Sequence, residues 1–199
     1  MVVADEVQVG CGRVGTHWWA FEAQGLTPDI VTIGKPLGNG HPIGAVVTTK
    51  EIAESFDSGM EFFNTFGGNP VSCATAAAVL GVVEEEQLRA NARDAGDVLV
   101  SGLKELAERS DRLGDVRGAG LFVGFVLVKG AGSDAADAVL ATELVECAKA
   151  RGVLLSTDGP LHDVIKIKPP IVFTPDDSAH LIAVIEASLL EAVSRLESC

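Results

Sequence analysis

The stretch Thr32–Gly40, TIGKPLGNG, places a single lysine, Lys35, between an apolar run and a glycine-rich turn. The run before it, DIVTI, is typical of a β-strand. Glycines on either side of the lysine let the backbone come close to a flat ligand, because they have no Cβ. We therefore expect Lys35 to stand at the end of a strand, beside a ligand-binding cleft.

Residues 1–85 alternate between strand-like and helix-like segments with short connections between them. Residues 2–10, VVADEVQVG, begin apolar and end in acids and a glycine, as a buried parallel strand does where it leaves a sheet. Further strands are expected at 27–34 and 42–49, and a short helix at 16–25. This order of elements predicts an α/β fold.

The chain from Pro70 onward has a more helical composition. Residues 70–88 and 89–110 both favour helix, and in the second segment Val98, Leu103 and Leu106 form a rough apolar stripe. The two segments together predict a long helical connector.

After the connector, strand-like and helix-like segments return. Strands are expected at 114–128, where glycines break the run in two, at 153–159 and at 163–173, and a helix is expected at 134–152. The last segment begins with Thr174 as N-cap, then a proline and two aspartates, which favours a helix that runs nearly to Cys199. We expect three parts: an incomplete α/β domain at 1–85, a helical connector at 86–110, and a small α+β domain at 111–199.

Charge and hydropathy exclude several classes of partner. The formal net charge is -13 and no long Lys/Arg cluster is present, so we expect neither nucleic acid nor membrane as a partner, and a small metabolite instead. No apolar run approaches the roughly 20 residues of a membrane span, and no signal-peptide pattern is visible, which predicts a cytoplasmic protein. The 47% of hydrophobic residues indicate either a large core or an apolar surface that contacts another chain.

The cysteines and the other candidate side chains favour structural roles. Cysteines at positions 11, 73, 147 and 199 are scattered without a C-x-x-C pair, which indicates reduced thiols, no disulfide framework and no metal site. His17 and His41 are expected to serve turns or packing. Arg13 and Arg117 stand in glycine-flanked turns and are interpreted as structural, with contact to a substrate phosphate as the alternative.

Three glycines, Gly10, Gly12 and Gly15, spell G-x-G-x-x-G after the first strand, which is the outline of a dinucleotide site. Two acids, Asp5 and Glu6, precede the turn and would repel a pyrophosphate. Two adjacent tryptophans follow it, where a small-residue helix start would be expected. We interpret the glycines as a structural turn and keep a nicotinamide cofactor as the alternative.

Asp5 and Lys35 together suit a different cofactor. The ends of parallel strands meet at one edge of a sheet, where ligands bind. There an amine can form a Schiff base with the aldehyde of pyridoxal phosphate, and a carboxylate can keep the pyridine nitrogen protonated. Thr65, just before a Gly-Gly-Asn-Pro turn, adds a hydroxyl near a helix start, where phosphate binds. The alternatives are a surface lysine with a salt-bridged acid, and an ordinary turn and cap.

Four stretches in one order resemble the class III aminotransferases, fold type I enzymes that use pyridoxal phosphate. They are residues 5–15, 28–47, 63–74 and 115–124. The resemblance implies the C-terminal part of the large domain of the pyridoxal-phosphate-dependent transferases, followed by a small α+β C-terminal domain.

The resemblance also implies roles for individual residues. Asp5 corresponds to the aspartate that pairs with the pyridinium nitrogen, Val7 to the apolar residue on the ring face, and Gln8 to the side chain near the ring hydroxyl. Lys35 corresponds to the Schiff-base lysine, which also moves protons at the substrate α-carbon. Thr65 corresponds to the threonine that reaches the cofactor phosphate of the neighbouring subunit, which implies a homodimer with a shared active site.

A finer match concerns the substrate. VLLSTDGP followed by VIKIKPPIVF resembles the ethanolamine-phosphate and phosphohydroxylysine phospho-lyase branch of the family. Other members have an arginine before the Pro-Pro pair that grips the substrate carboxylate, and Lys166 stands in its place here. A lysine lacks the planar fork of arginine, which suits phosphoethanolamine, an amine without an α-carboxylate. The alternative is an ω-aminotransferase that acts on a small amine and a 2-oxo acid.

The family's N-terminal portion, with its glycine-rich cup for the cofactor phosphate, has no counterpart before Asp5. We therefore expect a truncated product or a piece of a longer enzyme, whose sheet exposes an edge and a face. Three interpretations stay open: a pyridoxal-phosphate enzyme, an inactive fragment, and a nicotinamide-dependent oxidoreductase.

Overall fold

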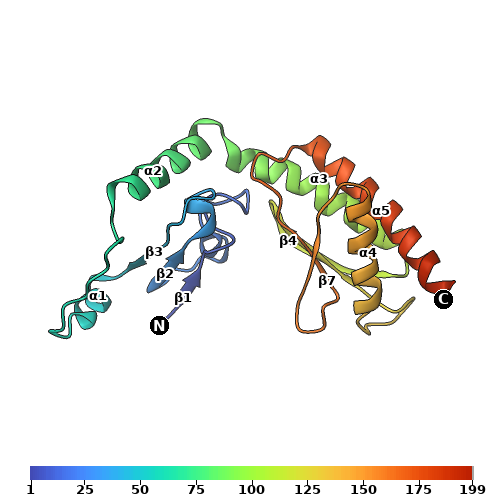
Figure 1. The fold of residues 1–199 in the computed structure, drawn as a ribbon, viewed down its shortest axis with the longest axis horizontal. Helices are drawn as coiled ribbons and strands as arrows, with labels where there is room; N and C mark the ends of the chain where they lie inside the picture. Colours follow the sequence, from blue (N-terminus) through green and yellow to red (C-terminus); the bar gives the residue numbers. More distant parts are fainter. Residues whose placement is uncertain (199) are drawn as a thin grey trace. The chain divides into compact units, whose positions relative to one another are not determined.

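The computed structural model describes residues 1–198, which form two compact units (Figure 1). The first unit is Met1–Ala90 and the second begins at Asn91. Cys199, one of the four cysteines considered above, lies outside the described residues.

The first unit contains a three-stranded sheet in the order β1-β2-β3. β1 pairs in parallel with β2, and β3 pairs antiparallel with β2 on its other side. The strands are β1 (Val3–Asp5), β2 (Ile30–Ile33) and β3 (Ala45–Thr48). Two short 3₁₀ helices and two α-helices complete the unit: η1 (Ala20–Gln24), η2 (Lys35–Leu37), α1 (Lys50–Phe56) and α2 (Pro70–Glu85).

These elements confirm the predicted α/β sheet and the parallel pairing of its first two strands. The expectation of a buried first strand is wrong for the described residues, because Val2 and Val3 are both exposed. β1 is an edge strand, and Val46 and Val47 on β3 are exposed too. The sheet therefore has an open edge and exposed apolar residues, as expected of a piece of a larger sheet.

The second unit places helices on one face of a four-stranded antiparallel sheet. The strand order is β4-β5-β7-β6. The strands are β4 (Leu113–Ala119), β5 (Phe122–Leu127), β6 (Ser156–Asp158) and β7 (Val164–Ile167). The helices are α3 (Leu88–Arg109), which begins just before the unit, α4 (Ala138–Ala150) and α5 (Pro175–Glu197).

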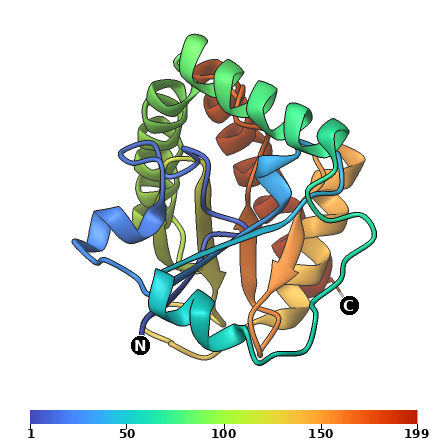
Figure 2. The same cartoon turned by 90° about the vertical axis from the view of Figure 1, so that its left-hand side faces the viewer.

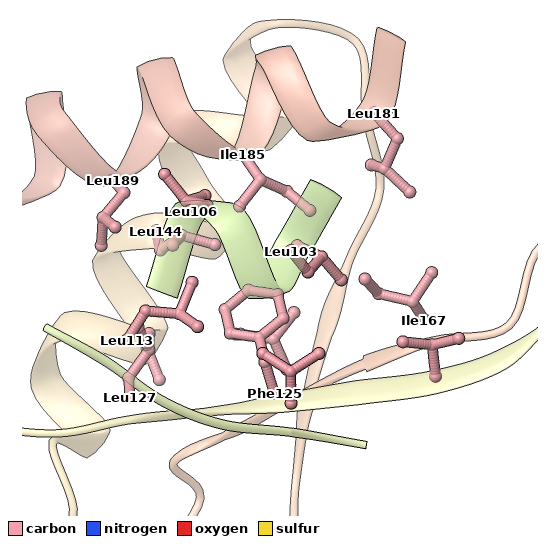
Figure 3. Close-up of a cluster of buried hydrophobic side chains, with 14 of the residues drawn as sticks. Leu103, Leu106, Leu113, Phe125, Leu127, Leu144, Ile167, Leu181, Ile185 and Leu189 are labelled. Carbon is pink, nitrogen blue, oxygen red and sulfur yellow. The ribbon is translucent and has the colours of Figure 1, made fainter. Parts of the chain in front are cut away.

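The core of the second unit lies between this sheet and the three helices (Figure 3). Figure 3 shows Leu103, Leu144 and Ile185, from three different helices, pointing toward Phe125 on the sheet. The expected stripe on α3 is correct for Leu103 and Leu106 and wrong for Val98, which is exposed. Leu99, one position later, is the buried residue, because 3.6 residues per turn puts 99, 103 and 106 on one face.

Several local signals in the second unit are confirmed. Thr174 accepts a hydrogen bond from Asp177 N, and the Asp177 side chain accepts one from Thr174 N, so α5 begins with a capping box. The 114–128 segment forms the β4 and β5 hairpin around Gly120, whose φ is +53°. A Cβ on Gly96 of α3 would lie 2.2 Å from the Gly120 carbonyl oxygen, so the helix packs directly on the hairpin turn.

Truncating a buried leucine of this core is expected to destabilise the fold strongly. Leu144 is fully buried on α4, so Leu144→Ala should lower the free energy of unfolding by about 2–5 kcal/mol, through lost burial and the cavity left behind. Leu190→Ala on α5 is the matched control, because this leucine is 69% exposed. Urea unfolding followed by circular dichroism measures both variants. Equal losses in the two would contradict the packing described.

Candidate active site

The register between β1 and β2 brings Asp5 to the strand end that leads into Lys35. Asp5 is paired with Thr32, three residues before Lys35. Its Oδ1 accepts a hydrogen bond of 3.0 Å from Val7 N and a longer one of 3.4 Å from the Thr32 hydroxyl. The Asp5 carboxylate is thus held in place while it stays exposed at the edge of the sheet.

The neighbouring acid, Glu6, has a different role that the sequence did not reveal. Its side chain is 2% exposed, and its two oxygens accept hydrogen bonds of 2.9 Å each from Ala20 N and Phe21 N. The carboxylate therefore fixes the start of η1 and stabilises the loop after β1. Because side chains alternate along an extended chain, burying Glu6 leaves Asp5 facing the other way.

Buried residues on either side of Lys35 anchor the backbone that carries it. Ile33 and Leu37 lie in the core of the first unit on either side of it, and Leu37 N donates a 2.8 Å hydrogen bond to the Gly34 carbonyl. Lys35 itself is exposed. A Cβ on Gly34 would lie 3.4 Å from Val7 Cγ1, so Val7 lies directly against the backbone that carries the lysine. Asp5, Val7 and Lys35 are thereby brought together, with half-buried Gln8 in the turn that follows.

The glycine turn after β1 does not form a dinucleotide site. Residues 7–16 form successive turns without a helix, and Gly12 and Gly15 have φ values of +82° and +80°. A Cβ on Gly10 would lie 3.0 Å from the Trp19 ring, so this glycine is needed for packing. The dinucleotide motif requires a helix start at the turn, so the nicotinamide alternative is wrong.

Thr65 lies in the long loop between α1 and α2, which Figures 1 and 2 draw without helix or strand. The loop is ordered by side chains: Asn64 Oδ1 accepts hydrogen bonds from the N–H groups of residues 66 and 67, and Asn69 caps α2 by accepting from Ser72 N. Ser72 Oγ is also 2.8 Å from His41 Nε2. His41 thus ties the turn after Lys35 to the start of α2, while the Thr65 side chain stays exposed.

The segment 56–66, which contains Thr65, has several large apolar side chains that are exposed to solvent. Phe63 is 78% exposed, and four more side chains of this segment are similarly open: Phe56, Met60, Phe62 and Phe66. We call these five residues the phenylalanine loop. A protein that leaves so many large apolar side chains exposed in one segment usually uses them for an interface.

Lys166 lies on the face of the second unit's sheet that is opposite the helices. In β5 and β7 every second residue is buried in the core, and Phe122, Gly124 and Lys166 belong to the other set. One row across the sheet runs Arg117, Gly124, Lys166 and Ser156. Lys166 is also among the residues that line a cavity of about 510 Å³, whose wall includes Ile167 and, from α5, His180, and does not include Asp158.

Lys166 has a partner that the sequence analysis missed. Its Nζ lies 2.5 Å from Asp158 Oδ2 and 5.7 Å from the centre of the Phe122 ring. The hydrogen bond from Lys166, together with one from Gly159 N and the charges of Lys166 and Lys168, lowers the pKa of the Asp158 carboxyl. The signal was present in the sequence, since a turn at 159–160 between two strand-like segments predicts a hairpin that brings these residues together.

The cysteines of the described residues are unpaired thiols. Burial, followed by the charge of Glu6, raises the pKa of Cys11 to about 11, so this thiol stays protonated at neutral pH. Within residues 1–198 no cluster of three metal-ligating side chains is found, and no helix is long and apolar enough to cross a membrane.

Comparison with known proteins identifies the family. The pattern of the family "Aminotransferase class-III" matches residues 1–189. The chain belongs to the class III aminotransferase family.

Individual relatives agree with this assignment. The chain is 52% identical over 178 residues to "Alanine--glyoxylate aminotransferase 2-like" of Drosophila melanogaster, covering 88% of this chain and 36% of the fly protein. It is 40% identical over 200 residues to "Ethanolamine-phosphate phospho-lyase homolog 1" of Caenorhabditis elegans, covering 99% and 40%. An Arthrobacter phospholyase solved in complex with phosphoethanolamine superposes with a TM-score of 0.90 at 44% identity, covering 94% of this chain and 44% of that one. The chain thus spans about two fifths of the length of the proteins it resembles.

The residues of this class III chain fit pyridoxal phosphate. Asp5 offers an oriented carboxylate, Lys35 an exposed amine on a fixed backbone, and Val7 an apolar surface beside them. A carboxylate for the ring nitrogen and an amine for the aldehyde are two of the groups that bind this cofactor.

The Asp158 carboxyl should titrate below its ordinary pKa of 3.8 because Lys166 donates to it. Replacing Lys166→Met removes that hydrogen bond and charge, so the pKa should rise toward 3.8, while the bond from Gly159 N remains. A lowered pKa in the folded state means that this pair stabilises the fold above the unfolded-state pKa, and that the contribution is lost as pH falls through the folded-state value.

Carbon-13 NMR of the aspartate carboxyls measures this pKa directly. Lys149→Met is the matched control, because it removes a lysine that pairs with Glu146 on α4. The Asp158 pKa should be the same in the control as in the wild type. A pKa that does not move in Lys166→Met would contradict the described pair.

Proposed function

We propose that the protein carrying this chain is a pyridoxal-phosphate-dependent phospho-lyase that removes phosphate from phosphoethanolamine or a similar small phospho-amine. The observation that carries the proposal is Lys166, which stands where an arginine would grip a substrate carboxylate and is already paired with Asp158. The likeness to the Arthrobacter phospholyase that was solved with phosphoethanolamine supports it.

Each residue of the proposed cofactor site in the first unit has a defined task in this proposal. When bound, pyridoxal phosphate draws electrons from the carbon next to the substrate nitrogen. Asp5, which Val7 N orients, accepts a hydrogen bond from the protonated ring nitrogen. Val7 packs on the ring face. Gln8 lies near the ring hydroxyl. Lys35 holds the cofactor and, once released, moves a proton at the substrate α-carbon.

The overall reaction converts phosphoethanolamine and water into acetaldehyde, ammonia and inorganic phosphate. The phosphate leaves from the β-carbon, so no 2-oxo acid is consumed. An ω-aminotransferase is the second candidate, which the 52% identity to an alanine–glyoxylate aminotransferase 2-like protein supports. Phosphate and acetaldehyde release without an added oxo acid distinguishes the lyase. A strict requirement for an oxo acid would overturn the lyase proposal in favour of the transaminase.

Lys35→Ala is expected to abolish covalent attachment of the cofactor, because the side-chain amine is the group that bonds to the aldehyde. The measurement is borohydride reduction of the loaded protein followed by peptide mass mapping, with the mass increase on the peptide that contains residue 35 in the wild type. Lys50→Ala is the control, since Lys50 is an exposed lysine on α1 of the same unit. Labelling of the Lys35→Ala protein at an unchanged level would refute the assigned role.

The proposal includes a homodimer whose two active sites are shared. The phenylalanine loop supports it, because its exposed aromatic side chains flank Thr65, the residue proposed to reach the cofactor phosphate of the neighbouring subunit. Aromatic side chains are typical of the centre of such interfaces. Burying them between two subunits would account for the apolar excess of the sequence.

Phe63→Asp is expected to weaken this dimer by at least about tenfold in Kd, because burying a charge in an apolar interface is costly. Sedimentation velocity over a range of concentrations measures the effect. Leu154→Asp is the control, since it introduces the same charge at an 84% exposed apolar residue of the second unit. A Phe63→Asp protein that dimerises as tightly as the control would argue against this interface.

The proposal keeps residues 1–85 as part of the cofactor-binding large domain, 86–110 as the helical connector and 111–199 as the small C-terminal domain. It also keeps a cytoplasmic location, which cell fractionation tests.

A further inference from the structure

Two contacts hold Lys166 in place. Asp158 Oδ2 accepts a hydrogen bond of 2.5 Å from its ammonium group, and the Phe122 ring lies 5.7 Å from Nζ. Gly124 on the neighbouring strand has no side chain and so leaves room for the lysine. The Lys166 side chain is only 20% exposed. A lysine with these contacts cannot swing freely toward an incoming anion.

Asp158 is 49% exposed, and two hydrogen bonds hold it. Its Oδ1 accepts a 2.8 Å hydrogen bond from Gly159 N while Oδ2 accepts from Lys166, so both oxygens are engaged. The hydrogen bonds from Lys166 and Gly159 N lower the pKa of this carboxyl. The nearby pair of Arg117 with Asp115 is 77% and 56% exposed, so the two pairs differ mainly in the cation, since Lys166 is 20% exposed and Arg117 is 77% exposed.

The positive charge of Lys166 and the negative charge of Asp158 cancel within the pair. A substrate carboxylate that approaches the Lys166 ammonium gains attraction from it, but it also comes close to the Asp158 carboxylate on the same ammonium. Like charges within a few ångströms repel each other, and this repulsion offsets the attraction. An amine without a carboxylate at this position meets no such repulsion.

We propose that Asp158 is a specificity-determining residue, which neutralises Lys166 and thereby excludes substrates that carry an α-carboxylate. The inference rests on the proposed function, since it concerns the choice between phospho-amines and phospho-amino acids. Asp158 acts through Lys166 as a positioning residue and takes no part in the chemistry. Discrimination of this kind works by repelling the wrong ligand rather than by adding contacts to the right one.

The test uses two substrates that differ only in the α-carboxylate: O-phosphoethanolamine and O-phosphoserine. In the complete protein that carries this sequence, loaded with pyridoxal phosphate, kcat/KM for phosphate release is measured with each. The wild type should prefer phosphoethanolamine. Asp158→Asn keeps the size of the side chain and removes its charge, so it should lower this preference at least about tenfold, mainly by improving phosphoserine.

Two control variants accompany Asp158→Asn. Asp158→Glu keeps the negative charge and should keep the wild-type preference. Glu146→Gln neutralises a carboxylate in the exposed Lys149 pair on α4, and it should change neither substrate. Thermal unfolding confirms that each variant is folded, and Asp158→Ser replaces Asp158→Asn if the asparagine variant is not.

A second readout separates this inference from the proposed function. Titration calorimetry of the cofactor-free protein with each phospho-compound gives an affinity ratio that does not depend on turnover. If the wild type releases phosphate and Asp158→Asn leaves the preference unchanged, the inference is wrong and the function stands. If no phosphate is released from either compound, the lyase proposal fails, and the affinity ratio alone decides: a gain for phosphoserine in Asp158→Asn supports the role of Asp158, and an unchanged ratio overturns it.

Discussion

The parallel pairing of β1 with β2 is the constraint on which the arrangement of Asp5 and Lys35 depends. Because Asp5 is in register with Thr32, the strand end that carries the carboxylate and the strand end that leads to Lys35 lie at the same edge. A slip of one residue would turn Asp5 inward and Glu6 outward. Burial of Glu6, whose carboxylate accepts two backbone hydrogen bonds, opposes that slip. The register and the buried acid therefore reinforce each other.

The second unit follows the same logic with an antiparallel sheet. Ile165 and Ile167 are buried against the helices, so Lys166 between them must point to the opposite face. Residues of the other strands that share its row become its neighbours automatically. Gly124 is one of them, and it provides room for the long lysine side chain. The core that stabilises the unit thus also fixes the position of Lys166, for which a role at the substrate is proposed.

The sequence predicted the local elements and the parallel pairing of β1 with β2, and it missed individual side-chain contacts between segments. The strands, the α5 cap at Thr174 and the turn before α2 follow from patterns within a few residues, and the structure has them. The Glu6 contacts join the end of β1 to backbone groups 14 and 15 residues later, and periodicity does not encode that. The Asp158 pair lies within one hairpin, so it could have been inferred from the turn at 159–160. Val98 shows a smaller limit, because a rough stripe did not separate it from the buried Leu99 beside it. The four stretches that resemble class III aminotransferases identified the family, because they occur in the family's order along the chain.

Lysine and aspartate together discriminate in a way that arginine at the same position would not. A guanidinium has five donors in a planar fork, so it can bind Asp158 along one edge and still offer another edge to a substrate carboxylate. An ammonium is a compact charge, and any second anion that it binds must lie within a few ångströms of the first. Removing the fork therefore weakens the grip on a carboxylate, and the fixed Asp158 adds repulsion at the same point. Lys166 and Asp158 therefore act as one specificity element. Neither a lysine in place of the arginine nor an aspartate beside it would have the effect of both together.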